Sequence, residues 1–179
     1  MPQMNDSFFT KTLTYLIRHN EEGALGIVIN KPMKVSLEDI FQELDIDYPS
    51  EPSSFGQQQV LAGGPVEKDK GFIIHNSSKT WDSSISASLS NSEQISICTS
   101  KTILQDIANG EGPEQYLIAL GCAGWEAGQL EQEISNNAWL TTPANAAVLF
   151  SRDFDAKSAQ AAAILGIDLQ QLAPTAGHS

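Results

Sequence analysis

The sequence predicts one α+β domain that spans residues 1–179. Short apolar runs bounded by glycine, proline and small polar residues are typical of β-strands, and they recur along the chain. Segments with capping residues and helical spacing lie among these runs and predict several short helices. No internal repeat and no linker-like segment divides the chain, whose length is usual for one domain. One α+β domain is therefore favoured over two.

The N-terminal part predicts a β-hairpin. Strand candidates at residues 12–18 and 24–30 are separated by a five-residue turn that contains Gly23. Two short strands joined by such a turn are a hairpin pattern. Lys31 and Pro32 follow the second strand and end it.

A short helix and a loop come next. Ser36 fits the N-cap position and Asp39 the third helical position, so the two form a capping box ahead of a helix over about residues 37–44. Residues 45–58 contain two prolines, several serines and little periodicity. They predict an exposed loop in which mobility is expected.

Further strands occupy the middle of the chain. The candidates are residues 60–62, 71–75, 85–89 and 95–99. A turn over residues 63–70 separates the first two of them. Ser100 or Thr99 can cap a helix that runs to about Ala108, and the Asn-Gly pair ending at Gly110 stops it.

The last third predicts a buried strand and two helices. Residues 116–120 form the apolar strand, and a glycine-rich turn over residues 121–128 leads into a helix of about two turns. Residues 144–150 fit neither pattern clearly. Residues 156–165 are an alanine-rich helix, which Gly166 ends.

Charge limits the class of partner. The formal net charge is −12, with 22 acidic and 10 basic residues. Non-specific affinity for nucleic acid comes mostly from Lys and Arg that neutralise phosphates, so direct DNA binding is disfavoured. No apolar run approaches the ~20 residues needed to cross a bilayer, and the polar N-terminal residues do not form a secretory leader. We therefore expect a cytoplasmic protein without membrane contact.

Two cysteines, Cys98 and Cys122, lie 24 positions apart and form no Cys-x-x-Cys pair. In a reducing compartment they are most simply two free, buried thiols. A redox role is the alternative, and it requires a lowered thiol pKa.

Residues in and near the hairpin turn offer groups for proton transfer. His19, Glu21 and Glu22 supply an imidazole and carboxylates, and His75 joins them if the strand ends meet. The alternative is that His19 and Asn20 build a hydrogen-bonded turn while the glutamates are solvated. Metal binding by the two histidines and a carboxylate lacks a paired-histidine motif to fix the ligands, so we assign no metal.

The segment 121–140 combines glycines, two tryptophans, amides and carboxylates. Trp125 and Trp139 flank a short helix with few other large apolar residues, so we expect both to be mostly buried. With Gln129 and Asn137 beside them, they provide flat apolar surface and polar groups suited to a small polar ligand or a partner's loop. A purely structural role for these residues is equally compatible with the pattern.

Two adjacent glycines, Gly63 and Gly64, precede Pro65. Their backbone N–H groups could form an anion-binding nest beside Asp69 and Lys70. A rigid turn between strands explains the same residues.

Five blocks together resemble the AlgH family, also called YqgE, of bacterial proteins. They are residues 19–32, 63–66, 71–75, 121–140 and the Gly177-His178 pair. The ordered set covers nearly the whole chain and is specific, although no single block is. The resemblance implies a strongly bent, bifurcated sheet that forms a pseudo-barrel with helices packed on it. Members usually carry a further apolar strand ahead of the position of Met1, which leaves open an upstream start or a missing edge strand.

The resemblance implies no reaction and only an association with transcriptional regulation. We therefore favour a non-catalytic binding module with an indirect regulatory role, and we assign no catalytic residue and no cofactor. Its partner is an unidentified protein or a small polar ligand. The candidate binding residues are His19, Asn20, Glu22, Asn30, Gly63, Gly64, His75, Trp125, Gln129, Glu131, Asn137 and Trp139. The alternative is an enzyme that uses His19, His75 and a carboxylate for acid/base chemistry on a small polar substrate.

Overall fold

The computed structural model describes residues 8–49, 58–88 and 94–169. Within these ranges the chain forms eight strands and five helices. The strands are β1 (Thr14–Asn20), β2 (Gly23–Val28), β3 (Pro32–Ser36), β4 (Gln59–Ala62), β5 (Val66–His75), β6 (Ile85–Ser88), β7 (Gln94–Cys98) and β8 (Tyr116–Glu126). The helices are α1 (Leu37–Glu43), α2 (Lys101–Ala108), α3 (Gln129–Ser135), α4 (Ala146–Leu149) and α5 (Lys157–Ile164).

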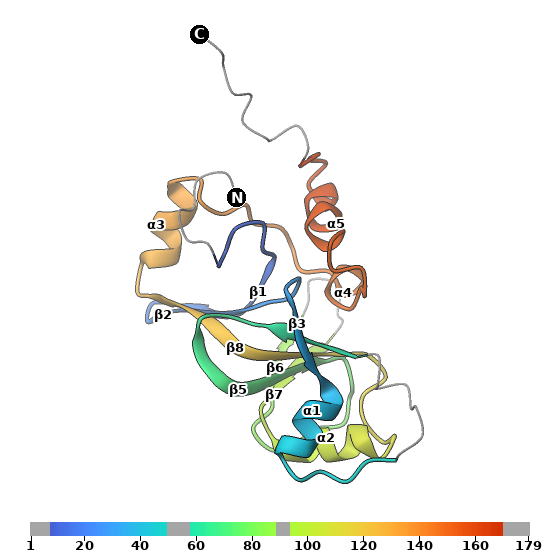
Figure 1. Ribbon diagram of the computed structural model, residues 1–179. Helices are drawn as coiled ribbons and strands as arrows, with labels where there is room; N and C mark the ends of the chain where they lie inside the picture. The colour runs from blue at the N-terminus through green and yellow to red at the C-terminus, as the bar shows by residue number, and fades with distance from the viewer. Residues whose placement is uncertain (1–7, 50–57, 89–93, 170–179) are drawn as a thin grey trace.

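The strands form one mixed sheet in the order β1-β2-β8-β5-β7-β6. Neighbours on this path are antiparallel, whereas β4 pairs with β8 in parallel and carries β3 on its other side. Helices α3, α4 and α5 lie on one side of the sheet, and α1 and α2 lie on the other (Figure 1). The path is open at β1 and β6, so the sheet bends towards a barrel without closing into one.

The sheet divides at the centre of β8. One edge of β8 pairs with β4 as far as Leu120 and with β2 from Ala123 onward. Gly121, between these two stretches, has a φ of 77°, a left-handed conformation that favours glycine. The Gly63 N–H donates to the Leu120 carbonyl, and the Gly63 carbonyl accepts from the Val28 N–H. These bonds join the two branches, and they confirm the bent, bifurcated sheet.

Alternating side chains of β8 and β5 fill a core on each face of the sheet. Leu117 and Ala119 of β8 pack with Phe72 and Ile74 of β5 on the face covered by α4. Their neighbours Ile118 and Ile73 pack on the opposite face, among side chains of α1 and α2. Because both faces are covered, these strand segments are apolar throughout.

Most of the expected elements are present. The N-terminal hairpin, the Ser36–Asp39 capping box and the α2 cap at Ser100 are confirmed. The alanine-rich helix α5 is confirmed and ends before Gly166, whose φ is 71°. The ambiguous residues 144–150 contain the single-turn helix α4. Most of the expected loop over 45–58, residues 50–57, lies outside the described ranges.

Two expected turns are wrong. Residues 66–70 of the expected turn over 63–70 belong to β5, which pairs with β8 at Val66 and again from Gly71 across an irregular stretch. The expected turn over residues 121–128 is instead the second half of β8 followed by a short turn, because β2 supplies pairing partners that continue the strand. A Cβ added to Gly124 would have no atom of the described ranges within 4 Å, so close backbone packing does not explain this glycine.

None of the helices in the described ranges is long and apolar enough to cross a membrane.

Candidate functional site

A mostly apolar cavity of about 320 Å³ opens between β1, α3 and the two C-terminal helices. We call it the tryptophan groove. Its lining residues are 12–16, Ile29, Trp125, Leu130, Ile134, 139–145, Val148, Leu149, Ala161 and Ile164. None of these side chains carries a charge. Segments from four distant parts of the sequence therefore enclose a neutral, apolar space.

A carboxylate fixes both tryptophans of the groove. The indole Nε1 groups of Trp125 and Trp139 donate to the same oxygen of Glu133, at 3.0 and 2.6 Å. The other Glu133 oxygen accepts from Gln129 Nε2 at 2.9 Å. Gln129 in turn accepts from the Glu126 N–H at 3.0 Å, which ties α3 to the end of β8. A buried indole N–H needs an acceptor, and here one side chain serves two of them.

The two indoles stack edge to face. Their ring centroids lie 5.6 Å apart at an interplanar angle of 76°, and Phe9 packs against both rings. Trp125 is 7% exposed, as expected, whereas Trp139 is only partly buried at the rim of this aromatic cluster. Trp139 therefore belongs to the wall of the groove more than to the core.

Two threonine hydroxyls at the groove have no partner in the described part of the protein. They are the Oγ1 atoms of Thr14, on β1, and Thr142, on the segment that joins α3 to α4. Both oxygens are buried. By contrast, Thr12 Oγ1 donates to the Phe9 carbonyl at 2.9 Å, and Asn145 Oδ1 accepts from the Val148 N–H as the N-cap of α4.

The hairpin turn reaches the same end of the molecule but stays on the surface. His19 Nε2 lies 2.6 Å from Glu131 Oε1, and both side chains are exposed. A hydrogen bond from its own backbone amide and the His19 contact hold the pKa of the Glu131 carboxyl below its usual value. Asn20 Oδ1 accepts from the Glu22 N–H at 3.0 Å, so the hydrogen-bonded turn is present.

Asn30 and Asn137 have structural partners. Asn30 accepts from the Leu13 N–H and donates to the Lys11 carbonyl and to Ser158 Oγ, which connects the chain before β1 with α5. Asn137 follows the last turn of α3 with a φ of 57°, and its N–H donates to the Ile134 carbonyl. Asparagine tolerates this left-handed position at a helix C-terminus better than most residues.

The pair Gly63 and Gly64 is buried at the branch of the sheet. A Cβ on Gly64 would lie 1.9 Å from the backbone carbon of Cys122, and one on Gly63 would lie 2.3 Å from the Gly121 oxygen. The Gly63 N–H is already used by the Leu120 carbonyl. Close backbone packing thus explains both glycines, and the geometry favours the rigid connection over an anion nest.

His75 lies at the opposite end of β8 from His19. It pairs with Tyr116 at the start of β8, whereas His19 pairs with Ala24, which pairs with Trp125 near its end. Nine residue steps along β8 separate these positions, a path of at most about 30 Å along the strand. The structure therefore does not bring the two histidines into one cavity.

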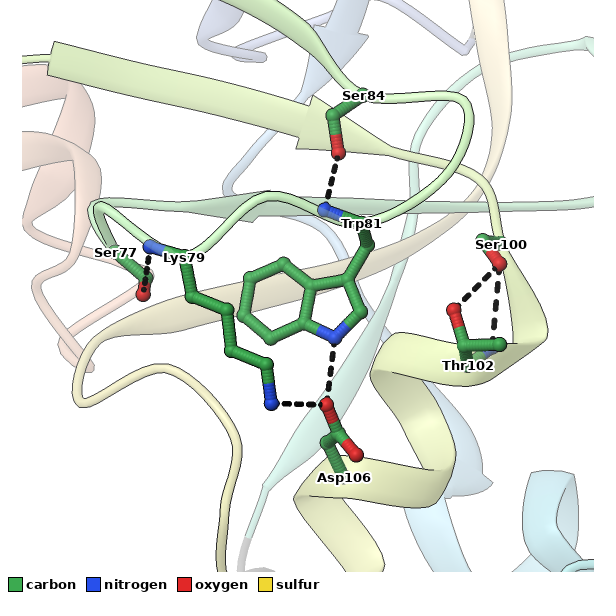
Figure 2. A network of polar contacts seen from close by, with 7 residues as sticks. All are labelled: Ser77, Lys79, Trp81, Ser84, Ser100, Thr102 and Asp106. Atoms are coloured by element: carbon green, nitrogen blue, oxygen red, sulfur yellow. Dashed lines mark hydrogen bonds and ion pairs between the residues drawn. The ribbon is translucent and has the colours of Figure 1, made fainter.

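His75 packs against Trp81, whose hydrogen bond to Asp106 is shown in Figure 2. The imidazole is fully buried, stacks edge to face on Trp81 at 5.0 Å, and accepts from the Ser77 N–H through Nδ1. Trp81 Nε1 donates to Asp106 Oδ2 at 2.7 Å, and Lys79 Nζ donates to the same oxygen at 2.6 Å. Hydrogen bonds from Lys79 and Trp81 lower the pKa of the Asp106 carboxyl, while burial lowers that of His75.

Neither a metal site nor a reactive thiol is favoured. The described ranges contain no group of three or more His, Cys, Asp or Glu side chains placed to hold a metal ion. Cys98 and Cys122 are free and buried, as expected. Burial and the neighbouring Glu67 carboxylate raise the pKa of the Cys122 thiol, which disfavours the nucleophilic thiolate.

Sequence reasoning missed several residues of the groove. Glu133 could have been found, because it lies four positions after Gln129 on α3 and the indole N–H groups of Trp125 and Trp139 need an acceptor. Thr14 and Thr142 carry no such signal. Their position at the groove depends on how β1 and the segment after α3 meet, 128 positions apart in the sequence.

The fold and the groove define an α+β protein with a bifurcated sheet and a neutral cavity. Residues 1–170 match the family described as AlgH-like. The chain is 44% identical over 178 residues to a UPF0301 protein of Alcanivorax borkumensis, covering 99% of this chain and 92% of that one. It is 45% identical to a UPF0301 protein of Pseudomonas putida, covering 100% and 92%. The chain therefore belongs to the AlgH-like family.

Solved structures agree with this assignment. The solution structure of the AlgH protein from Pseudomonas aeruginosa is 43% identical, with a TM-score of 0.78 and coverage of 100% of this chain and 92% of that chain. A crystal structure of a Corynebacterium diphtheriae protein is 19% identical, with a TM-score of 0.60 and coverage of 84% and 75%. This second likeness concerns the fold alone.

Proposed function

We propose that the protein is a single-domain, non-catalytic binding module that takes a small ligand into the tryptophan groove. The observation that carries this proposal is the groove itself. Its volume of about 320 Å³ falls within the range of small-molecule sites, about 300–1,000 Å³. Its walls are mostly apolar and aromatic, with a few threonines and one asparagine among the lining residues, which is the usual composition of such sites.

The enzyme alternative has less support. It needs His19, His75 and a carboxylate within hydrogen-bond reach of one substrate. His19 and Glu131 meet on an exposed surface, while His75 is buried beside Trp81 at the other end of the sheet. No described feature joins them in one pocket.

An indirect role in transcriptional regulation fits a cytoplasmic ligand-binding protein of this charge. With a formal net charge of −12, we expect DNA binding to be weak and indifferent to sequence at physiological salt. A regulatory effect would then pass through a protein partner that senses the occupied groove. A strong preference for one duplex, together with a steep fall of affinity with salt, contradicts this expectation in a mobility-shift titration.

A fluorescent probe tests the proposal. N-phenyl-1-naphthylamine is neutral, apolar and bright only when shielded from water. We expect saturable binding at one site, which Trp139→Ala weakens by about tenfold or more because a groove wall is removed. Leu140→Asn, at an exposed position on the rim, should weaken it without loss of the fold.

Ile85→Ala is the matched control, because Ile85 is the most exposed of the large hydrophobic side chains on the described surface, at 59%, and lies outside the groove. Far-ultraviolet circular dichroism confirms that each variant is folded. If the probe does not bind, or if Ile85→Ala reduces binding as much as Leu140→Asn does, the groove is not the binding site.

A further inference from the structure

We infer that a free α-amino acid with an apolar side chain binds a second cavity, between the two edge strands of the sheet. We call it the edge cavity. Its volume of about 340 Å³ lies at the lower end of the range of small-molecule sites. In the described ranges it shares no lining residue with the tryptophan groove, so this inference does not depend on the proposed function.

The edge cavity exists because the sheet does not close into a barrel. β1 and β6 are the two ends of the strand order, and each contributes an isoleucine to the cavity, Ile17 and Ile85. The buried side chains of Phe72 and Ile97, on β5 and β7, line it as well. Ile85 is 59% exposed, so a ligand placed against it removes apolar surface from water. These walls favour an apolar side chain.

A pair of opposite charges, Glu67 and Lys70 of β5, lines the same cavity. Lys70 Nζ donates to Glu67 Oε1 at 3.4 Å, and both side chains are about half exposed. The Cys122 thiol donates to the other Glu67 oxygen at 3.7 Å, and the Lys70 ammonium lies 5.5 Å from the centroid of the Phe72 ring. An ammonium has three N–H donors and a carboxylate about four acceptor sites, so both groups keep capacity for a ligand.

The charge pair favours a ligand that carries both charges. A ligand with one charge gains one attraction and one repulsion, because an anion also meets the Glu67 carboxylate and a cation also meets the Lys70 ammonium. An α-amino acid carries its carboxylate and its ammonium on one carbon, so both reach side-chain charges that lie 3.4 Å apart. The ligand carboxylate then accepts from Lys70, the ligand ammonium donates to Glu67, and the side chain packs on the apolar walls.

The backbone conformation at the cavity supports a role for Glu67 beyond the packing of β5. Glu67 has a φ of 48° and Ser83 a φ of 61°, a left-handed region that is uncommon for residues other than glycine. Both residues line the edge cavity. Strained residues cluster at ligand sites, where the surrounding structure holds a functional side chain in place.

A series of compounds related to leucine tests the ligand class. The compounds are L-leucine, glycine, 4-methylpentanoate, 3-methylbutylamine and N-acetyl-L-leucinamide, and backbone amide chemical shifts both measure and locate their binding. We expect L-leucine to bind about tenfold or more tightly than each other compound, because glycine lacks the apolar side chain and the rest lack one or both charges. The amides of Glu67, Lys70 and Ile85 should shift.

Three results overturn the inference. They are no binding of L-leucine, shifts confined to residues of the tryptophan groove, and binding of a leucine analogue as tight as that of L-leucine. In the last case, N-acetyl-L-leucinamide would indicate a peptide segment as the occupant, and either singly charged analogue would show that the zwitterion is not selected.

Variants that remove one charge locate the two ends of the ligand. Lys70→Met should weaken L-leucine about tenfold and leave 3-methylbutylamine no weaker, whereas Glu67→Gln should weaken L-leucine about tenfold and leave 4-methylpentanoate no weaker. Lys68→Met is the control, because Lys68 is exposed on the same strand and does not line the cavity. Far-ultraviolet circular dichroism confirms the fold of each variant. Equal losses for all compounds, or a loss in Lys68→Met that matches that in Lys70→Met, overturn the assignment.

Discussion

Two tryptophan–carboxylate clusters stand at opposite ends of β8, and they are built differently. At one end Asp106 accepts from Trp81 and from the Lys79 ammonium, so the carboxylate is paired with a cation. At the other end Glu133 accepts from two indoles and an amide, and no ion pair involving it occurs in the described ranges. The first cluster closes over the buried His75, while the second borders an open groove.

The difference shows that a carboxylate hydrogen-bonded to tryptophan can support either the stability of a core or the shape of a binding groove. A paired carboxylate satisfies an indole and holds a loop on α2, which completes a closed core. A carboxylate satisfied by neutral donors orients two aromatic rings without placing a cation near them, which leaves their faces beside a neutral cavity. We therefore assign stability to the Trp81 cluster and binding to the Trp139 cluster.

The largest expected effect is that of Trp81→Ala. Trp81 is 8% exposed, so its removal should lower the free energy of unfolding by ~3–5 kcal/mol, as for other large-to-small core changes. Trp139 is partly buried, so Trp139→Ala should cost less, ~1–3 kcal/mol, while it weakens probe binding. Urea denaturation of both variants measures this. Equal losses of stability, or loss of probe binding in a folded Trp81 variant, would break the comparison.

The buried Lys157 on α5 should make the free energy of unfolding depend on pH in the alkaline range. Lys157 on α5 is fully buried and donates to the Leu149 carbonyl at 2.7 Å, and burial lowers the pKa of its ammonium to about 8 from 10.5. Between these values the unfolded chain binds more protons, so stability rises with pH, by about 3 kcal/mol over the full window. Denaturant unfolding between pH 7.5 and 9.5 should show this rise in wild-type protein relative to Lys157→Met. Parallel curves would contradict it.

The contribution of His75 to the free energy of unfolding should instead depend on pH in the acidic range. Burial lowers the pKa of His75 below 6.5, so the unfolded chain binds the proton first as pH falls. The stability contributed by the neutral imidazole is complete above pH 6.5 and is lost below it, by at most ~1.4 kcal/mol per pH unit. His75→Asn keeps an acceptor for the Ser77 N–H and cannot titrate. The free energy of unfolding of this variant should fall less steeply from pH 6.5 to 5.0 than that of wild-type protein. Equal slopes in a denaturant titration would contradict the prediction.

The smallest effect is expected from removing the ion pair between Lys79 and Asp106. Lys79→Met should lower the free energy of unfolding by ~0.5–1 kcal/mol at low salt, because the pair is partly exposed. The loss should shrink in 1 M NaCl as screening weakens the pair in wild-type protein. Leu140→Asn, at the other end, should show no such salt dependence. A salt-independent loss in Lys79→Met would mean that packing against Trp81, not charge, matters there.

Sequence patterns predicted correctly those features of the fold that depend on interactions between neighbouring residues. The Ser36–Asp39 capping box, the Ser100 cap of α2 and the end of α5 before Gly166 depend on residues within a few positions of each other. The limits of β5 and β8 were predicted less well, because strand length depends on partners elsewhere in the chain. Gly121 looked like the start of a turn and is instead a bend inside β8.

The sequence by itself determined the α+β class, the caps of α1 and α2, the end of α5, the two free thiols and the negative charge that opposes nucleic acid. It also singled out Trp125, Trp139 and Gln129. Only the tertiary structure decided that Glu133 joins both indoles, that His19 and His75 lie near opposite ends of β8, and that β1 and the segment after α3 line a common groove. The reason is physical: caps and charge are properties of neighbouring residues, whereas a cavity exists only where distant segments pack without filling the space between them.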